Sequence, residues 1–154
     1  MATPNTASVL ADDRITAFGM VIEATRRLER TFERSLRERH DLSLVAFEAL
    51  LRLGRSREQQ MSMTELADQM VLTSGGVTRL VDRLASAGQV ERLQCASDRR
   101  VQWAKLTPHG RDVIEAATAT HLSDLEAHFV AEMSSEEMAT VSRVFDRLRT
   151  DHPD

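Results

Sequence analysis

Six residues between positions 73 and 83 have the side chains and the spacing needed to contact a polyanion. Arg79 and Arg83 are four positions apart, so on a helix their guanidinium groups lie on the same side. A guanidinium group can bind a phosphate or a guanine through two parallel hydrogen bonds. The other four residues offer hydroxyl groups or an unobstructed backbone for the same purpose: Thr73, Ser74, Gly75 and Thr78. This segment therefore indicates contact with nucleic acid.

Two features of this segment have a second interpretation. Gly75 and Gly76 are poor helix formers, and each costs about 1 kcal/mol relative to alanine. They either let a phosphate approach the backbone or are simply tolerated in the first turn of a helix. Arg83 either contacts nucleic acid or pairs with Asp82 or Glu91.

A second cluster of charged residues, Asp98, Arg99 and Arg100, lies between two candidate strands. Residues 90–93 alternate between apolar and polar side chains like a half-buried strand, and residues 101–106 form the second candidate. We expect a hairpin with both arginines at its tip. The alternative is that an acid beside two bases only forms a solvated turn.

A helix must hold Arg79 and Arg83 in place. Thr73 can cap its N-terminus, and Gly88 can take the left-handed conformation at its end. A shorter helix over residues 64–70, capped by Thr64, and a turn at 71–72 complete a helix-turn-helix unit. Four apolar residues recur at helical spacing and predict the buried side of the second helix: Val77, Leu80, Val81 and Leu84.

The order of these segments resembles the multiple antibiotic resistance regulator (MarR) family. VTRLVDRLASAGQVER is followed by SDRR and then by LTPHG, at the spacing of that family. The resemblance implies a dimeric winged-helix transcription regulator that binds double-stranded DNA. It further implies that Ser74, Thr78 and Arg79 enter the major groove, that Arg99 reaches the minor groove, and that Asp98 orients the loop.

The rest of the chain predicts helices. Residues 12–39 carry apolar side chains at three- and four-residue steps over about seven turns. A second helix capped by Ser43 should end near Gly54, and residues 61–63 suggest a short strand. A further helix should run from Pro108 to about residue 132, and residues 134–137, SSEE, read as the capping box of a last helix.

The expected fold class is mostly α-helical with a small β-hairpin wing. Residues 1–39 should supply an arm and a dimerisation helix, residues 40–107 the winged helix-turn-helix lobe, and residues 108–154 the C-terminal dimerisation helices. One domain of 154 residues cannot easily cover the apolar stripes of both terminal helices, so we expect a homodimer. The alternative is a self-contained helical bundle.

Composition favours a cytoplasmic protein. The net charge is −4, yet the nine charged residues at positions 73–107 are six basic and three acidic, which gives this segment +3. No run of about 18 apolar residues predicts a membrane span, and the N-terminus lacks the pattern of a signal peptide. A single cysteine, Cys95, fits a reducing compartment.

Other function classes have weaker support. Cys95 at the base of the wing offers a redox switch, and His109, His121 and His128 a zinc site, but no cysteine or close carboxylate completes the metal set. No phosphate loop, H-E-x-x-H or nucleophile elbow indicates an enzyme, and no cofactor is expected. The main alternative is a winged-helix protein-interaction module, which would have its arginines Arg79, Arg83 and Arg99 paired or buried.

An effector site is expected where the dimerisation helices meet the DNA-binding lobe. Apolar walls with a few cations suit a small aromatic acid, and the resemblance implies phenolic or carboxylate effectors that release DNA. Three helices should contribute to this site, from either chain. The residues expected to line it are Phe18, Ile22, Arg26, Phe47, Leu51, His109, Arg111 and Val113.

Overall fold

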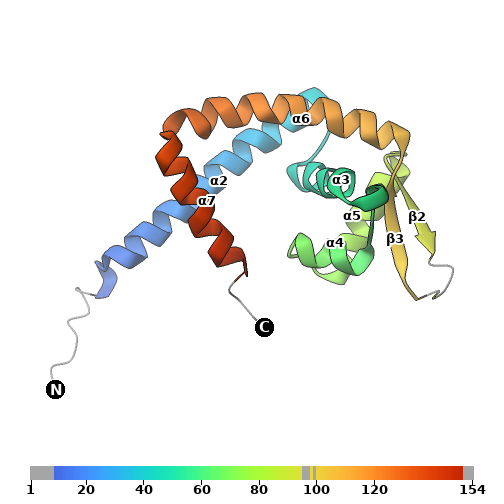
Figure 1. The fold of residues 1–154 in the computed structure, drawn as a ribbon, viewed down its shortest axis with the longest axis horizontal. Coiled ribbons are helices and arrows are strands. Elements are labelled where there is room, and N and C mark those ends of the chain that lie inside the picture. Colours follow the sequence, from blue (N-terminus) through green and yellow to red (C-terminus); the bar gives the residue numbers. More distant parts are fainter. Residues whose placement is uncertain (1–8, 95–97, 99, 151–154) are drawn as a thin grey trace, which may run out of the picture.

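A computed structural model describes residues 9–94, 98 and 100–150 of the protein, with helices arching over a small sheet (Figure 1). The expected class, mostly helical with a wing, is confirmed. In the labels of Figure 1 the α-helices are α2 (Asp13–His40), α3 (Leu44–Arg55), α4 (Met63–Gln69), α5 (Ser74–Ser86), α6 (Pro108–His128) and α7 (Ser135–Thr150). The strands are β1 (Gln60–Ser62), β2 (Val90–Gln94) and β3 (Gln102–Leu106), and two 3-10 turns lie at Arg57–Gln59 and Val130–Glu132.

Helix α2 ends where the sequence predicts. Asp41 takes the left-handed conformation with φ 53°, and its N–H donates to the carbonyl groups of the last turn. Ser43 then caps α3 by accepting a hydrogen bond from the N–H of Ala46 at 3.2 Å. The chain therefore changes direction between the two helices within three residues.

The start of α4 differs from the expectation. The cap is Ser62 and not Thr64: Ser62 Oγ accepts from Glu65 N at 3.2 Å, and Glu65 Oε2 accepts from Ser62 N at 3.0 Å. This reciprocal pair is a capping box, and it satisfies two N–H groups where a threonine at position 64 would satisfy one. As a result β1 covers residues 60–62 and not 61–63.

The sheet has the strand order β1-β3-β2, with both pairs antiparallel. Met61 pairs with Ala104 in one ladder, and Arg92 pairs with Ala104 in the other. Met61 and Ala104 are buried on the inner face, together with Val90 and Leu106 at the base of the hairpin. The inner face of the wing is thus anchored to the lobe by small and medium apolar side chains.

The hydrophobic core lies within the lobe. Phe47, Leu50 and Leu53 of α3 are its centre, and residues of α4, α5 and the sheet pack around them. The C-terminal half of α2 joins through Leu36. Helix α2 is therefore fixed to the lobe at its C-terminal end.

His121 of α6 occupies the junction of three helices. Its ring lies 4.9 Å from that of Phe32 in α2 and 4.7 Å from that of Phe47 in α3, measured between centroids. Burial lowers the pKa of His121, and the nearby carboxylate of Asp124 partly opposes this. The ring therefore serves as a packing element; within the described residues no three potential metal ligands converge.

The C-terminal helices also differ in their bounds. Helix α6 stops at His128 and not near residue 132, because Phe129 leaves the helical region at φ −130°. The predicted capping box of α7 is present, since Ser134 and Glu137 exchange hydrogen bonds at 2.8 and 3.3 Å. Within the described helices, none is long and apolar enough to cross a membrane.

Helices α2, α6 and α7 form an arch (Figure 1), and apolar side chains on these helices are exposed. Phe18 in the first half of α2 is 65% exposed, and Phe145 of α7 is 49% exposed. Other apolar residues exposed on these helices are Ile15, Met20, Val21, Leu122 and Leu148. The expected apolar stripes exist, and the chain by itself leaves them open to solvent.

Candidate nucleic-acid interface

Helix α5 has the buried and open sides that the sequence predicts. Its four stripe residues, Val77, Leu80, Val81 and Leu84, are buried in the lobe. Thr73 caps the helix by accepting from Gly76 N at 3.1 Å. Residues on the other side are exposed: Thr73, Ser74, Gly75, Arg79, Asp82 and Arg83. The open side of α5 therefore carries most of the predicted contact residues.

The two arginines of α5 are available for a ligand. Arg79 and Arg83 are both exposed, and neither forms an ion pair with any residue that the structure describes. Neither of the two acids that were alternative partners of Arg83 pairs with it. Asp82 pairs with Arg92, and Glu91 is exposed. Arg79 and Arg83 are thus neither paired nor buried, as expected for a DNA-binding surface, while Arg99, the third arginine of that criterion, lies outside the described residues.

The glycines and Thr78 are distinguished by their surroundings. A Cβ added to Gly75 would meet only the far end of Arg79, at 3.9 Å, so the backbone there is open to approach. A Cβ on Gly76 would lie 3.2 Å from Oγ1 of the capping Thr73, so this glycine makes room for the cap. Thr78 is half-buried, and its hydroxyl donates to Ser74 O at 2.8 Å. The two glycines thus have different local roles.

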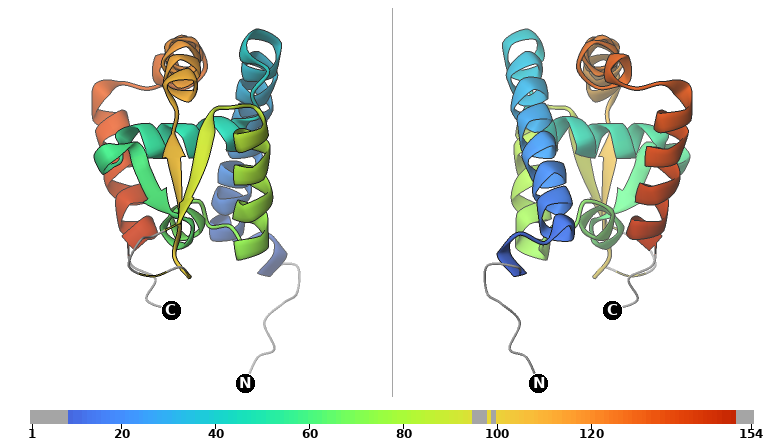
Figure 2. Two further views of the ribbon diagram at one scale, coloured as in Figure 1. Left: turned by 90° about the vertical axis from the view of Figure 1, so that its right-hand side faces the viewer. Right: turned by 90° about the vertical axis from the view of Figure 1, so that its left-hand side faces the viewer.

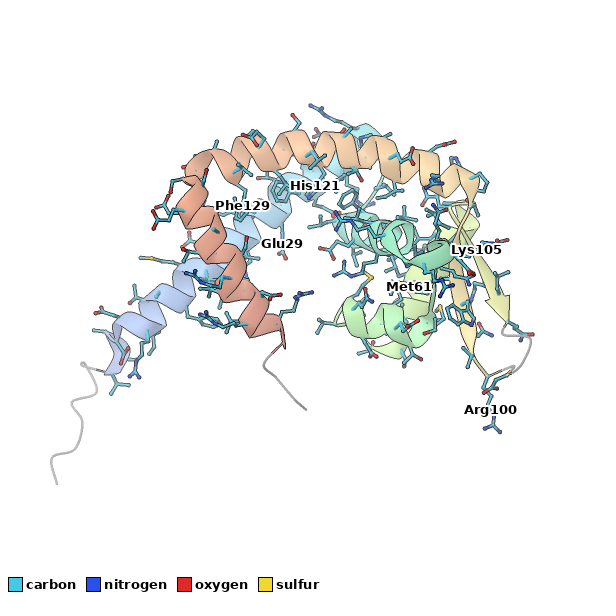
Figure 3. The ribbon with its side chains drawn as sticks, in the orientation of Figure 1. Glu29, Met61, Arg100, Lys105, His121 and Phe129 are labelled. Carbon is cyan, nitrogen blue, oxygen red and sulfur yellow. The ribbon has the colours of Figure 1, made fainter. Side chains whose placement is uncertain are left out.

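The tip of the wing is a turn organised by Asp98. Its Oδ1 accepts from Arg100 N at 2.9 Å, and its carbonyl accepts from Val101 N at 3.0 Å. The side chain of Arg100 is exposed and points away from the body of the molecule (Figure 3). Arg99 and Cys95 lie outside the described residues, so the predictions made for them stay predictions.

The wing and α5 present their ends to the same side of the molecule. The first turn of α5 and the end of the hairpin lie away from α6, which runs along the opposite edge (Figure 2). Helix α4 lies beside them on that side. The first turn of α5 and the exposed Arg100 at the wing tip therefore lie on the same side of the molecule.

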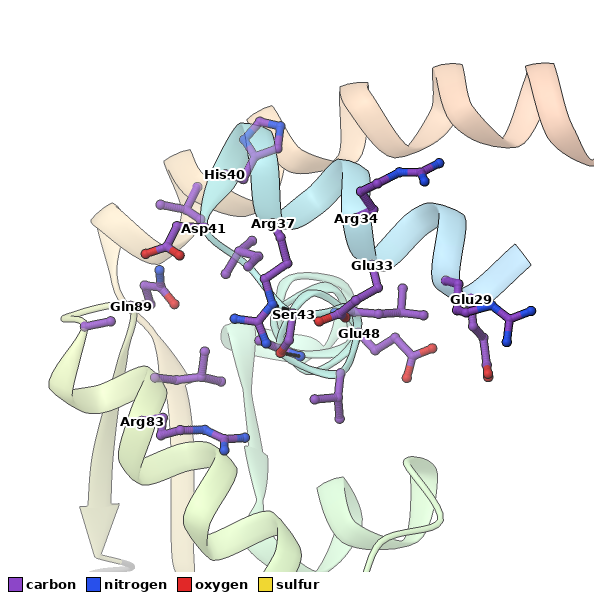
Figure 4. Close-up of a pocket in the computed structure, with 18 of the residues that line it drawn as sticks. Glu29, Glu33, Arg34, Arg37, His40, Asp41, Ser43, Glu48, Arg83 and Gln89 are labelled. Carbon is purple, nitrogen blue, oxygen red and sulfur yellow. Dashed lines mark hydrogen bonds and ion pairs between the residues drawn. The ribbon is translucent and has the colours of Figure 1, made fainter. Parts of the chain in front are cut away.

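The predicted effector residues are divided between two hollows. Arg26, His109 and Val113 line an open groove of about 1200 Å³ between α2, α3, the end of α5 and the start of α6 (Figure 4). Leu51 and Arg111 line a smaller hollow of about 270 Å³ against β3. Within one chain the expected single site is therefore not formed, because α3 and α6 pack directly against each other.

The remaining three effector residues line neither hollow. Phe47 is buried in the core against His121, which removes it from any ligand surface. Phe18 is exposed, and Ile22 is half-buried, on the part of α2 that extends away from the lobe. Both residues therefore lie away from the two hollows within one chain.

The groove contains a structural carboxylate among its arginines. Burial would raise the pKa of Glu33, but the hydrogen bonds it accepts from Leu44 N and from Arg37 outweigh this and lower it. Arg37 Nε lies 2.8 Å from Glu33 Oε1. Glu33 thus stays ionised and holds the start of α3 against α2. Arg83 of α5 lines the opposite wall of the groove.

Sequence reasoning missed one residue of this surface. Arg92 Nη1 lies 2.5 Å from Asp82 Oδ1 of α5, and Arg92 Nη2 lies 2.9 Å from Gln102 Oε1 of β3. The signal was in the alternation of β2, which places Arg92 on the same side as the buried Val90. An arginine on the inner face of a strand needs an acceptor, and Asp82 supplies it.

The known proteins that resemble this sequence are MarR and other HTH-type transcriptional regulators. The model of the MarR family matches residues 42–101. The chain is 30% identical over 84 residues to the multiple antibiotic resistance protein MarR of Salmonella typhimurium, which covers 54% of this chain and 58% of that protein. The chain thus spans less than two thirds of that relative. An HTH-type transcriptional regulator of Bacillus cereus is 29% identical over 111 residues, 72% of each chain.

Solved structures share the fold over almost the whole chain. The MarR family regulator Sco3205 from Streptomyces coelicolor, in complex with DNA, superposes with a TM-score of 0.88 and 25% identity over 94% of each chain. A mutant MarR from E. coli complexed with operator DNA gives 0.77 and 25% identity, over 88% of this chain and 96% of that one. Both superpositions include helices that lie outside residues 42–101, the part of the chain that the family model matches.

Proposed function

This chain is a winged-helix protein of the MarR family, and from that premise we propose that it is a transcription regulator that binds duplex DNA. Helix α5 enters the major groove, and the wing contacts the adjacent minor groove. The observation that carries the proposal is the exposed pair Arg79 and Arg83, which has no acidic partner among the described residues. The DNA in the structures of Sco3205 and the E. coli protein supports the same use of this fold.

The finer proposal is a homodimeric repressor acting in the cytoplasm. Two observations favour a second copy of the chain as partner. Each chain has one recognition helix, and the arch of α2, α6 and α7 leaves Phe18 and Phe145 exposed. Two recognition helices related by a two-fold axis require a pseudo-palindromic operator.

The expected complex contains two chains on one duplex, with half-sites about 10 base pairs apart centre to centre. Footprinting on the region upstream of the protein's own gene would locate the site, and analytical ultracentrifugation would give the stoichiometry. A random duplex of equal length is the control, and it should bind more weakly and with strong salt dependence. A single-chain complex or an asymmetric footprint would contradict the dimer, and no binding to any duplex would favour the interaction module.

We further propose that the groove beside α2 holds an anionic aromatic effector such as salicylate. Its walls combine three apolar residues, Leu44, Leu84 and Val113, with one cation from α2, Arg26, and one from α5, Arg83. An occupant touching α2 and α5 together would change the distance between the recognition helices of a dimer. A ligand that prefers the non-binding arrangement by roughly 1–3 kcal/mol would lower operator affinity about 5- to 150-fold.

Titration of the operator complex with salicylate, alongside calorimetry on free protein, measures this coupling. Arg26→Ala should weaken ligand binding, because Arg26 lines the groove. Arg27→Ala is the matched control, since Arg27 is the next residue and pairs with Glu23 at 2.7 Å outside the groove. Binding that leaves operator affinity unchanged, or no binding at millimolar ligand, would rule out this effector.

A further inference from the structure

Three side chains join the wing to the recognition helix. Arg92 of β2 donates to Asp82 of α5 at 2.5 Å and to Gln102 of β3 at 2.9 Å. We infer that these three residues, here called the strut, position the wing for DNA binding. The inference rests on the proposed function, and it assigns Arg92 a positioning role instead of a DNA contact of its own.

The strut lies where apolar packing of the wing ends. At the base of the hairpin Val90 and Leu106 face each other and are buried. One step further along the inner face stands the pair Arg92 and Ala104, and then the pair Gln94 and Gln102. Beyond Ala104 the described residues of the hairpin thus include no buried apolar side chain on this face, and the strut provides the contact with α5.

The strut also engages the one acidic side chain of the recognition helix. Asp82 is the single acid in the sequence of α5, and it lies between Arg79 and Arg83. Because Arg92 occupies its carboxylate, Asp82 is drawn toward the wing and not toward either arginine. The same interaction therefore orients the hairpin and leaves two cations of α5 available.

A hollow beside the strut connects two predicted DNA contacts. It has a volume of about 570 Å³ and is lined by Thr64 of α4, Thr78 of α5 and Arg100 of the wing, with Arg92 and Gln102 in its wall. The relative orientation of wing and α5 determines the width of this hollow. A change in the strut therefore moves Arg100 relative to Thr78.

Loss of the strut should leave the fold intact. The side chain of Arg92 is 35% exposed and that of Asp82 is 53% exposed. Ion pairs this accessible contribute little to stability, so the melting temperature should fall by less than about 4 °C. Any large loss of DNA affinity in strut variants is then an effect on geometry.

The sharpest test is Asp82→Ala. Removing a negative charge from a DNA-facing helix should by simple electrostatics strengthen binding to a polyanion. The strut predicts the opposite: a higher Kd for operator and random duplex, and a salt slope reduced by about 1 as a wing contact is lost. Glu91→Ala is the matched control, because Glu91 is exposed on the outer face of β2 and its loss should leave affinity equal or higher. Equal behaviour of the two variants would overturn the inference.

A double-mutant cycle separates positioning from direct contact. If Arg100→Ala raises Kd roughly tenfold in the wild-type background, it should raise Kd less than roughly threefold in the Arg92→Ala background, because the wing is already displaced. Additive effects would mean that Arg92 acts on DNA by itself. Arg92→Lys should restore only part of the affinity, since one ammonium group cannot reach Asp82 and Gln102 in the same planar geometry.

Hydrogen exchange in the DNA-free protein distinguishes failure of the strut from failure of the proposed function. Amides of Gln94 and Gln102, which face each other in the ladder, should exchange faster in Asp82→Ala and Arg92→Ala than in Glu91→Ala. Unchanged exchange overturns the strut even if the wild type binds DNA. The strut variants could also exchange faster in a protein that binds no duplex. This result would show that the strut supports the wing, but it would reject both the role of the strut in DNA binding and the proposed function.

Discussion

Gly110→Ala is expected to destabilise the protein by at least about 3 kcal/mol, enough to lower the melting temperature by roughly 6–12 °C. A Cβ at Gly110 would lie 1.9 Å from Gln89 O and 2.8 Å from Gln89 C, far inside van der Waals contact. That carbonyl cannot easily move away, because it also accepts from Thr107 N at 3.1 Å. The substitution therefore separates the start of α6 from the turn before β2.

Gly54→Ala is the matched control for this substitution. Its added Cβ would meet Leu106 at 3.8 Å and Ile114 at 4.0 Å, which are ordinary contacts in the same part of the lobe. Alanine is also favoured over glycine in a helix, by about 1 kcal/mol, so this variant should be neutral or more stable. Thermal unfolding followed by circular dichroism compares the two variants. A Gly110→Ala protein that melts with the wild type would show that this junction is not closely packed.

Arg79→Ala is expected to relax base preference at one position of each half-site, by about 1–3 kcal/mol if its guanidinium group binds one guanine through two hydrogen bonds. The physical basis is the exposed position of Arg79 in the second turn of α5, beside an open backbone at Gly75. Selection from randomised duplexes measures the preference directly. Affinity for random duplex should change little in comparison.

Variants of the wing arginines are the controls for the prediction that Arg79 reads a base. Arg99→Ala and Arg100→Ala should weaken binding to all sequences and flatten the salt dependence, because a wing arginine meets phosphates and a narrow minor groove. Arg100 already points away from the lobe at the wing tip (Figure 3). Equal losses of specific and random binding in the Arg79 and wing variants would show that α5 does not read bases.

Local features of this protein were predictable because their causes lie within a few residues. The cap at Thr73, the left-handed Gly88 with φ 70° and the capping box of Ser134 and Glu137 follow from side chains that reach their own backbone. The stripe of α5 follows from helical periodicity. The capping box of α4 is equally visible in the sequence as Ser62-Met63-Thr64-Glu65, and the expected cap at Thr64 is wrong.

Contacts between elements were decided only by the tertiary structure. The strut joins Asp82 to Arg92 across a helix and a strand, and no sequence period specifies which arginine reaches that carboxylate. The close approach of Gly110 to Gln89 O depends on how α6 leaves β3, and the division of the effector residues depends on how α3 and α6 pack. Spacing along the chain determines which face of an element a residue occupies. The distance between faces of different elements is determined by packing, which responds to the shapes of all the side chains in the core at once.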